Sequence, residues 1–201
     1  MASTNGHGKL SINETFSGSK ILITGATGFI GSVVLEKMLR SCPDIATIYV
    51  LMRSRGGTDV HDRVKNLFRT PLFKKITPEL QNKVVAISGD VSKPSLGLSD
   101  EDRAELCLQV TIVFHVAASI NFNATLQSAV RTNLMGTKRI LELCYDMPAI
   151  KALVFVSSAF CNSMLGSVLV EQVYPPDRDP NEIIELMQVM SPQAIVKATP
   201  K

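Results

Sequence analysis

The sequence predicts an α/β fold built on a doubly wound parallel sheet, and three observations lead to this prediction. Strand-like segments alternate with helix-like segments along most of the 201 residues. The strand-like segments are almost continuously apolar, as expected where both faces of a sheet are buried. A glycine-rich turn also separates the first predicted strand from the first predicted helix.

Five apolar segments are expected to be strands. With right-handed crossovers they would lie in the order 3-2-1-4-5 within the sheet. In chain order, the segments are Lys20–Thr24, Thr47–Met52, Val84–Ile87, Ile112–Val116 and Ala152–Val156. The polar, Gly- and Ser-containing residues 1–18 are expected to be a disordered lead-in, so the predicted domain covers residues 19–201.

Helical periodicity and capping signals place the helices between and after these strands. The first has apolar residues at helical spacing and stops before Pro43. Ser99 with Asp102, and Asp179 before Pro180, are typical N-terminal caps. The predicted helices are Phe29–Arg40, Val60–Phe68, one beginning at Ser99, Asn123–Tyr145 and one from about Pro180 to Met190.

Composition excludes several classes of protein. The net charge of +3 is too small to indicate a nucleic-acid-binding surface. The chain has four cysteines without a CxxC pair and only three histidines, so we expect neither a metal site nor a disulfide framework. We find no signal peptide and no apolar run long enough to span a membrane, and expect a soluble intracellular chain.

The glycine-rich turn has the spacing of a dinucleotide-binding motif. Gly25, Gly28 and Gly31 form G-x-x-G-x-x-G between a strand and a helix. Such glycines permit a tight turn, a close approach of backbone to a pyrophosphate, and close packing of the helix on the strand. The N-terminus of the following helix would then face the phosphates. This motif makes the predicted fold Rossmann-type.

The residues after the second and third strands bear on which dinucleotide binds. NAD-binding domains place an acidic residue after the second strand, whereas this chain has Arg53 and Arg55 there. Two guanidinium groups suit the 2′-phosphate of NADP, although they could also be ordinary loop residues. After the third strand, Asp90 could accept a hydrogen bond from adenine or could cap a turn.

Several of these motifs together resemble the extended short-chain dehydrogenase/reductases. The motifs are Gly25-x-x-Gly28-x-x-Gly31, Gly89-Asp90-Val91, Phe114-His115-Val116-Ala117-Ala118, Asn133-x-x-Gly136-Thr137 and Val156-Ser157-Ser158-Ala159. Other segments resemble the fatty acyl-CoA reductases more narrowly. These are Glu36–Asp44, Tyr49–Arg53, Pro71–Phe73, Leu96–Ser99, Tyr174–Pro176 and Thr199–Lys201. The resemblance begins at about residue 17 and reaches the last residue.

The resemblance implies NADPH-dependent reduction of a long-chain fatty acyl-CoA, through an aldehyde, to a fatty alcohol. It also implies a cofactor site. That site comprises Gly25, Thr27, Gly28, Phe29, Ile30 and Gly31 at the pyrophosphate, Arg53 at the 2′-phosphate, Asp90 and Val91 at the adenine, Ala117, Ala118 and Ser119 beside the nicotinamide ribose, and Asn133 as support.

By the same resemblance, Ser158 is the expected catalytic hydroxyl, donating a hydrogen bond to the substrate oxygen as charge develops on it. Its neighbour Ser157 would point the other way along an extended chain. We expect His115 to be a hydrogen-bonded core histidine, because it lies in an apolar strand. Cys161 has no visible base beside it and is not expected to be a nucleophile.

The reductases of this family also use a Tyr-x-x-x-Lys pair as proton donor, and this chain has none. Its tyrosines, Tyr49, Tyr145 and Tyr174, are followed four residues later by Arg53, Ala149 and Arg178. The resemblance places the pair beyond the last residue. We therefore expect a truncated cofactor domain that is incomplete on its C-terminal side, exposes its fifth strand, and is inactive alone.

Alternative functions remain at this point. The chain could be a non-catalytic NADP-binding or interaction module, or an extended reductase or epimerase acting on another substrate. Expected partners are long-chain fatty acyl-CoA and either a second copy or a full-length enzyme, but not nucleic acid. The resemblance implies association with the cytosolic face of the peroxisome or endoplasmic reticulum.

Overall fold

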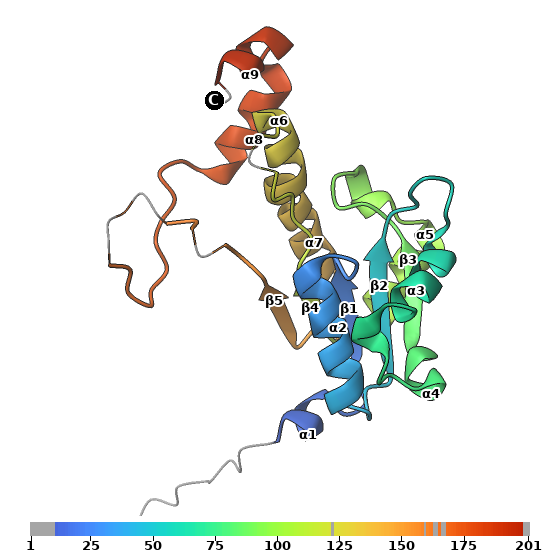
Figure 1. The fold of residues 1–201 in the computed structure, drawn as a ribbon. Coiled ribbons are helices and arrows are strands. Elements are labelled where there is room, and N and C mark those ends of the chain that lie inside the picture. The colour runs from blue at the N-terminus through green and yellow to red at the C-terminus, as the bar shows by residue number, and fades with distance from the viewer. Residues whose placement is uncertain (1–10, 122, 159, 163–164, 166–167, 199–201) are drawn as a thin grey trace, which may run out of the picture.

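A five-stranded, all-parallel sheet forms the centre of the structure, a computed structural model that describes residues 11–121, 123–158, 160–162, 165 and 168–198 (Figure 1). The strands are β1 (Lys20–Thr24), β2 (Thr47–Met52), β3 (Val84–Ser88), β4 (Ile112–His115) and β5 (Ala152–Phe155). Their order is β3-β2-β1-β4-β5. The doubly wound α/β fold and the predicted strand order are confirmed.

The helices follow the strands in alternation. They are α1 (Ile12–Phe16), α2 (Phe29–Ser41), α3 (Val60–Phe68), α4 (Pro78–Gln81), α5 (Asp100–Gln109), α6 (Leu126–Ala129), α7 (Met135–Tyr145), α8 (Pro180–Val189) and α9 (Pro192–Ala198). Three segments of other helical types are η1 (Pro71–Phe73), η2 (Pro94–Gly97) and η3 (Val130–Leu134). The predicted caps at Ser99 and Asp179 are confirmed, because each side chain accepts a backbone N–H in the first turn.

Two separate hydrophobic cores lie on the two faces of the sheet. Ile21 and Ile23 of β1 point into a core shared with α2 and α3, whereas Leu22 points into a core shared with α5 and α7. Successive side chains of a strand point to opposite faces, so a continuously apolar strand supplies both cores. Because all four strand pairs are parallel, the carboxyl ends of the strands lie along one edge of the sheet.

The N-terminal segment differs from its expected disorder over α1. Ser11 caps this short helix by a capping box, in which its Oγ accepts from Glu14 N–H and the Glu14 carboxylate accepts from Ser11 N–H. The ring of Phe16 packs 6.4 Å from that of Phe114. The Ser-x-x-Glu spacing was a visible signal for this turn. Residues 1–10 lie outside the described part of the chain.

The long helix predicted over Asn123–Tyr145 is shorter and interrupted. It begins at Leu126, after Thr125 accepts a hydrogen bond from Ser128 N–H as the cap. Between α6 and α7 the segment η3 is one π-helical turn. Such turns insert an extra residue into a helix and often lie at functional sites. Sequence periodicity alone does not distinguish this insertion from a continuous helix.

β5 forms one edge of the sheet, and the chain then leaves the sheet (Figure 1). Its residues Val154 and Phe155 are 40% and 50% exposed. α8 and α9 lie beside η3 and α6. Within the described residues, no helix has both the length and the apolarity needed to cross a membrane. Ala159 and the ending Thr199–Lys201 lie outside the described residues.

Candidate functional site

A cavity of about 930 Å³ opens at the carboxyl edge of the sheet. Its walls come from the loops that follow β1, β2, β3 and β4. The connections after β1 and β4 run to opposite sides of the sheet, because β2 and β5 flank this central pair. The cavity therefore lies at the topological switch point, where ligands of open α/β sheets bind.

The glycine-rich turn forms one wall of the cavity. Gly25 adopts φ +72°, and a Cβ there would lie 2.7 Å from Ala117 N. A Cβ on Gly31 would lie 2.1 Å from Gly25 O, so the start of α2 packs directly on the turn. Gly28 is the N-cap of α2 and makes no side-chain cap hydrogen bond. An uncapped helix N-terminus facing a cavity is suited to binding an anion.

The predicted pyrophosphate residues divide into two groups. Gly25, Thr27 and Gly28 line the cavity. Phe29, Ile30 and Gly31 form the first turn of α2 instead, with both larger side chains exposed and Gly31 buried. None of these three is a lining residue of the cavity.

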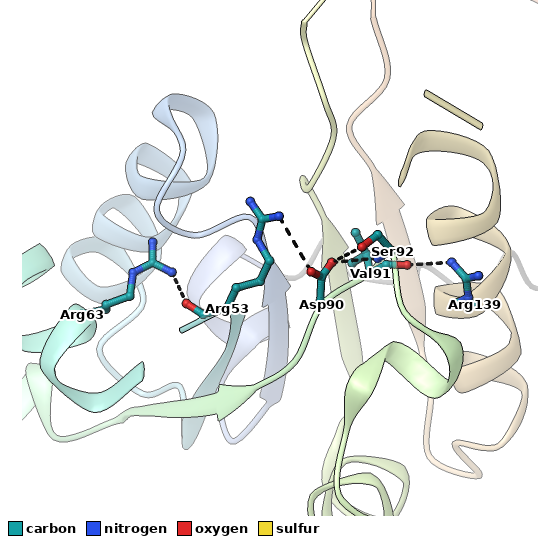
Figure 2. A network of polar contacts seen from close by, with 6 residues as sticks. All are labelled: Arg53, Arg63, Asp90, Val91, Ser92 and Arg139. Atoms are coloured by element: carbon teal, nitrogen blue, oxygen red, sulfur yellow. Dashed lines mark hydrogen bonds and ion pairs between the residues drawn. The ribbon is translucent and has the colours of Figure 1, made fainter. Parts of the chain in front are cut away.

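Three arginines meet at the end of the cavity beside β2. Arg53 and Arg55 follow β2, and Arg63 projects from α3. The Arg63 guanidinium donates to the carbonyl oxygen of Arg53 (Figure 2) and lies 3.4 Å from Thr27 Oγ1. Burial, followed by the charges of Arg53 and Arg55, lowers the pKa of Arg63. Mutual repulsion of this kind is relieved when an anion binds between the cations.

Asp90 lies beside this cluster and is held on several sides (Figure 2). Its Oδ2 lies 3.8 Å from Arg53 Nη1, while its Oδ1 accepts from Ser92 N–H at 2.9 Å and Ser92 Oγ at 2.8 Å. Burial alone would raise the pKa of Asp90, but the Ser92 hydrogen bonds and the charges of Arg53 and Lys93 lower it overall. Asp90 therefore caps a turn with one oxygen and presents the other toward the cavity.

Arg139 of α7 holds the loop after β3, which carries Asp90 and Val91. Its Nη1 donates to the Val91 carbonyl oxygen at 2.9 Å (Figure 2). Asp90 N–H donates to Leu96 O at 2.6 Å, which closes the loop on η2. Asp90 and Val91 both line the cavity, as the adenine assignment requires.

The loop after β4 forms the opposite wall. Ala117, Ala118 and Ser119 line the cavity there. Thr24 Oγ1 accepts the N–H groups of Val116 and Ala117, each at 3.1 Å. Asn133 is not a lining residue, but its amide holds both backbone groups of Ser119, at 2.7 and 3.0 Å. Its expected supporting role therefore has a geometric basis.

His115 is hydrogen-bonded through both ring nitrogens, as expected for a core histidine. Its side chain is 1% exposed, with Nδ1 2.7 Å from Thr24 Oγ1 and Nε2 3.2 Å from Thr137 Oγ1. The ring stacks on Phe155 at a centroid distance of 5.6 Å. Burial lowers the pKa of His115 to about 4, so the imidazole is neutral at pH 7.

Comparison with known proteins decides the family. A sequence profile described as male sterility protein, of the NAD-binding type, matches residues 23–197. The chain belongs to this family. Fatty acyl-CoA reductase 1 of Xenopus laevis is 40% identical over 195 residues, which cover 96% of this chain and 38% of the relative. The mouse enzyme of the same name is 36% identical over 197 residues, with the same coverage of each chain. The resemblance to fatty acyl-CoA reductases is confirmed.

Solved structures agree with the family's reductase fold. The terminal R domain of the myxalamid PKS-NRPS pathway is 31% identical, with a TM-score of 0.60, over 71% of this chain and 35% of that one. The PhqB reductase domain of Penicillium fellutanum has a TM-score of 0.58 at 24% identity, over 90% of this chain and 45% of that one, and supports the fold alone. The chain spans less than two-fifths of the length of the two fatty acyl-CoA reductases.

Ser158, the hydroxyl that the family resemblance assigns to catalysis, does not line the cavity. It follows β5 and is exposed, and its Oγ accepts from Phe160 N–H at 3.1 Å. Cys161 is a free, exposed thiol. Among the described residues, no three His, Cys, Asp or Glu side chains are grouped to hold a metal ion.

Arg63 and Lys93 also line the cavity, although sequence reasoning did not select them. A signal for Arg63 existed. A basic residue near the N-terminus of a helix interacts unfavourably with the helix dipole. The placement of Arg63 on α3 therefore indicated a role other than stabilising the helix. Lys93 offered no comparable signal, because basic residues are ordinary in loops.

Proposed function

We propose that this chain binds NADPH as the cofactor domain of a reductase that converts long-chain fatty acyl-CoA to fatty alcohol. The main support for this proposal is the group formed by Arg53, Arg55 and Arg63. They lie beside β2 at one end of the cavity at the topological switch point. A phosphate monoester bears up to two negative charges. It can therefore balance the positive charges of neighbouring guanidinium groups and accept their hydrogen bonds. The family membership and the fatty acyl-CoA reductase relatives support a fatty acyl-CoA as the substrate.

The residues present fit such a cofactor along the whole cavity. The 2′-phosphate would lie at the arginine group, with adenine near Asp90 and Val91. The pyrophosphate would lie at the backbone of the glycine turn. The nicotinamide ribose would lie beside Ala117–Ser119, whose backbone Thr24 and Asn133 hold.

When bound, one NADPH would supply a hydride to the carbonyl carbon of the acyl thioester, from which the CoA thiolate leaves, and a second NADPH would supply a hydride to the carbonyl carbon of the aldehyde. We assign Ser158 the donation of a hydrogen bond to the carbonyl oxygen as negative charge develops there. Ser158 is exposed after β5, where a substrate can reach its hydroxyl. The chain contains no Tyr-x-x-x-Lys to supply the proton.

A non-catalytic dinucleotide-binding module is the second candidate function. Two observations favour it for the chain by itself: Ser158 is not a lining residue of the cavity, and the proton-donor pair is absent. Binding NADPH without acyl-CoA-dependent oxidation separates this function from that of a complete reductase. Association with a full-length partner, and location at the peroxisome or endoplasmic reticulum, remain predictions.

Ligand-dependent thermal unfolding tests the proposal. NADPH at tenfold its Kd should stabilise the chain by about 1.4 kcal/mol. NADH at the same concentration should stabilise it much less, because NADH lacks the 2′-phosphate. Equal stabilisation by the two nucleotides would refute the specificity, and stabilisation by neither would refute cofactor binding.

A further inference from the structure

His115 and four other residues form a network of hydrogen bonds that runs from β1 through η3 to the loop after β4. Thr24 Oγ1 lies 2.7 Å from His115 Nδ1, and His115 Nε2 lies 3.2 Å from Thr137 Oγ1. Thr137 Oγ1 then donates to Asn133 O at 2.7 Å. At the far end, the Asn133 amide holds the backbone of Ser119. The network thus joins two segments that line or support the cavity.

The donors and acceptors in this series of hydrogen bonds allow only one assignment of the hydrogens. Thr24 Oγ1 already accepts two backbone N–H groups, from Val116 and Ala117. A hydroxyl has two lone pairs and one hydrogen, so Thr24 must donate that hydrogen to His115 Nδ1. The Thr137 hydroxyl hydrogen is used on Asn133 O, so Thr137 must accept from His115 Nε2. The imidazole is therefore neutral, with its proton on Nε2.

This series of hydrogen bonds joins three elements that are far apart in sequence. Thr24 and His115 are register partners in neighbouring strands, and Thr137 is in the first turn of α7. Neither His115 nor Thr137 lines the cavity. Any effect they have on a ligand there must pass through the positions of Thr24, Asn133 and the loop between Val116 and Ser119.

We propose that His115, in its Nε2–H form, is a positioning residue that holds the nicotinamide-side wall of the cavity. It ties the end of β1 to α7, and so sets the Val116–Ser119 backbone relative to the glycine turn. The inference rests on the proposed binding of NADPH. It adds that His115 and Thr137, although outside the cavity, determine affinity for the nicotinamide half of the ligand and not for the adenosine half.

Paired variants of Thr137 test this proposal. Thr137→Val removes the hydroxyl at nearly constant shape, whereas Thr137→Ser keeps it. One net hydrogen bond corresponds to about a threefold to tenfold change in Kd. We expect that weakening of NADPH binding for Thr137→Val, and little change for Thr137→Ser. Binding of 2′,5′-ADP, which occupies only the adenosine half, should be equal in both variants and the unchanged chain.

The outcomes separate this inference from the proposed function. Loss of stability without a change in NADPH affinity would show a structural role alone and overturn the inference. Equal weakening of NADPH and 2′,5′-ADP would overturn it as well. Nitrogen NMR of the unliganded chain, with His115→Gln to assign the signal, gives a readout independent of cofactor binding. The proposal requires a protonated Nε2 and a bare Nδ1, and the opposite tautomer would refute it.

Discussion

The Arg53 guanidinium lies 3.8 Å from the Asp90 carboxylate, across the mouth of the cavity where β2 and β3 end side by side. Arg53 is exposed, and its backbone carbonyl accepts from Arg63. An exposed ion pair at this distance contributes little to stability. Arg53 can therefore turn toward an anion at small cost, while Asp90 retains its hydrogen bonds from Ser92.

Replacing Arg63 should weaken NADPH binding more than NADH binding. Loss of a charge-assisted hydrogen bond to phosphate costs about 1.5–3 kcal/mol, which is roughly a tenfold to hundredfold rise in Kd. Titration of Arg63→Gln with each nucleotide measures the difference. Lys65→Gln on the same helix removes the same charge away from the cavity and is the matched control. Similar effects of both variants would indicate a general charge effect.

Gly31→Ala should destabilise the fold and abolish nucleotide binding. The new Cβ would lie 2.1 Å from Gly25 O, and backbone cannot move aside as a flexible side chain can. Overpacking of this kind costs about 1–3 kcal/mol or more. Urea unfolding measures the loss. Val33→Ala, at a more exposed position of α2, should change stability far less. A Gly31→Ala chain as stable as the unchanged chain would contradict the close packing of Gly31 on Gly25.

The stability of the chain should fall as pH decreases from 6.5 to 4. His115 has a pKa of about 4 in the folded chain against 6.5 ordinarily, so the unfolded state binds the proton first. Stability therefore rises with pH through this window, by about 3 kcal/mol for this group. Urea unfolding at several pH values measures the slope. In His115→Gln the rise in the free energy of unfolding between pH 4 and 6.5 should be smaller by that amount. An unchanged rise would show that other groups cause it.

Purified 201-residue chain should not oxidise NADPH in the presence of palmitoyl-CoA. General acid catalysis contributes about 10²- to 10⁴-fold to rates, and no Tyr-x-x-x-Lys is present to provide it. Absorbance at the nicotinamide band measures turnover. Heat-treated chain provides the background, and acyl-CoA-dependent oxidation above it would contradict the prediction.

β5 should promote self-association at high concentration. It is an edge strand, and Val154 and Phe155 on it are substantially exposed. Unpaired apolar edges are common sites of association, which inward or edge charges prevent. Light scattering should show a concentration-dependent mass that Val154→Lys reduces. Val33→Lys on α2 is the control, and a monodisperse monomer at high concentration would contradict the prediction.

Much of the fold could be predicted because its signals are local. Apolar runs located all five strands, and the handedness of crossovers predicted their order; capping signals marked the starts of two helices. The π-helical turn η3 and the helix α1 were missed. Apolar periodicity alone does not distinguish the one-turn η3 from a continuous helix, whereas the Ser11–Glu14 capping box was a signal that a polar, Gly- and Ser-containing composition obscured.

The sequence by itself determined the glycine turn, the arginines after β2 and the family. The glycine turn and the arginines depend on residues close together in the chain, and the family depends on short motifs that are each local in sequence. Only the tertiary structure decided that Arg63 joins Arg53, that His115 lies between Thr24 and Thr137, and that Ser158 is not a lining residue of the cavity. These relationships depend on strand register and helix placement, because residues 10 to 91 positions apart in the chain meet only after both faces of the sheet are packed.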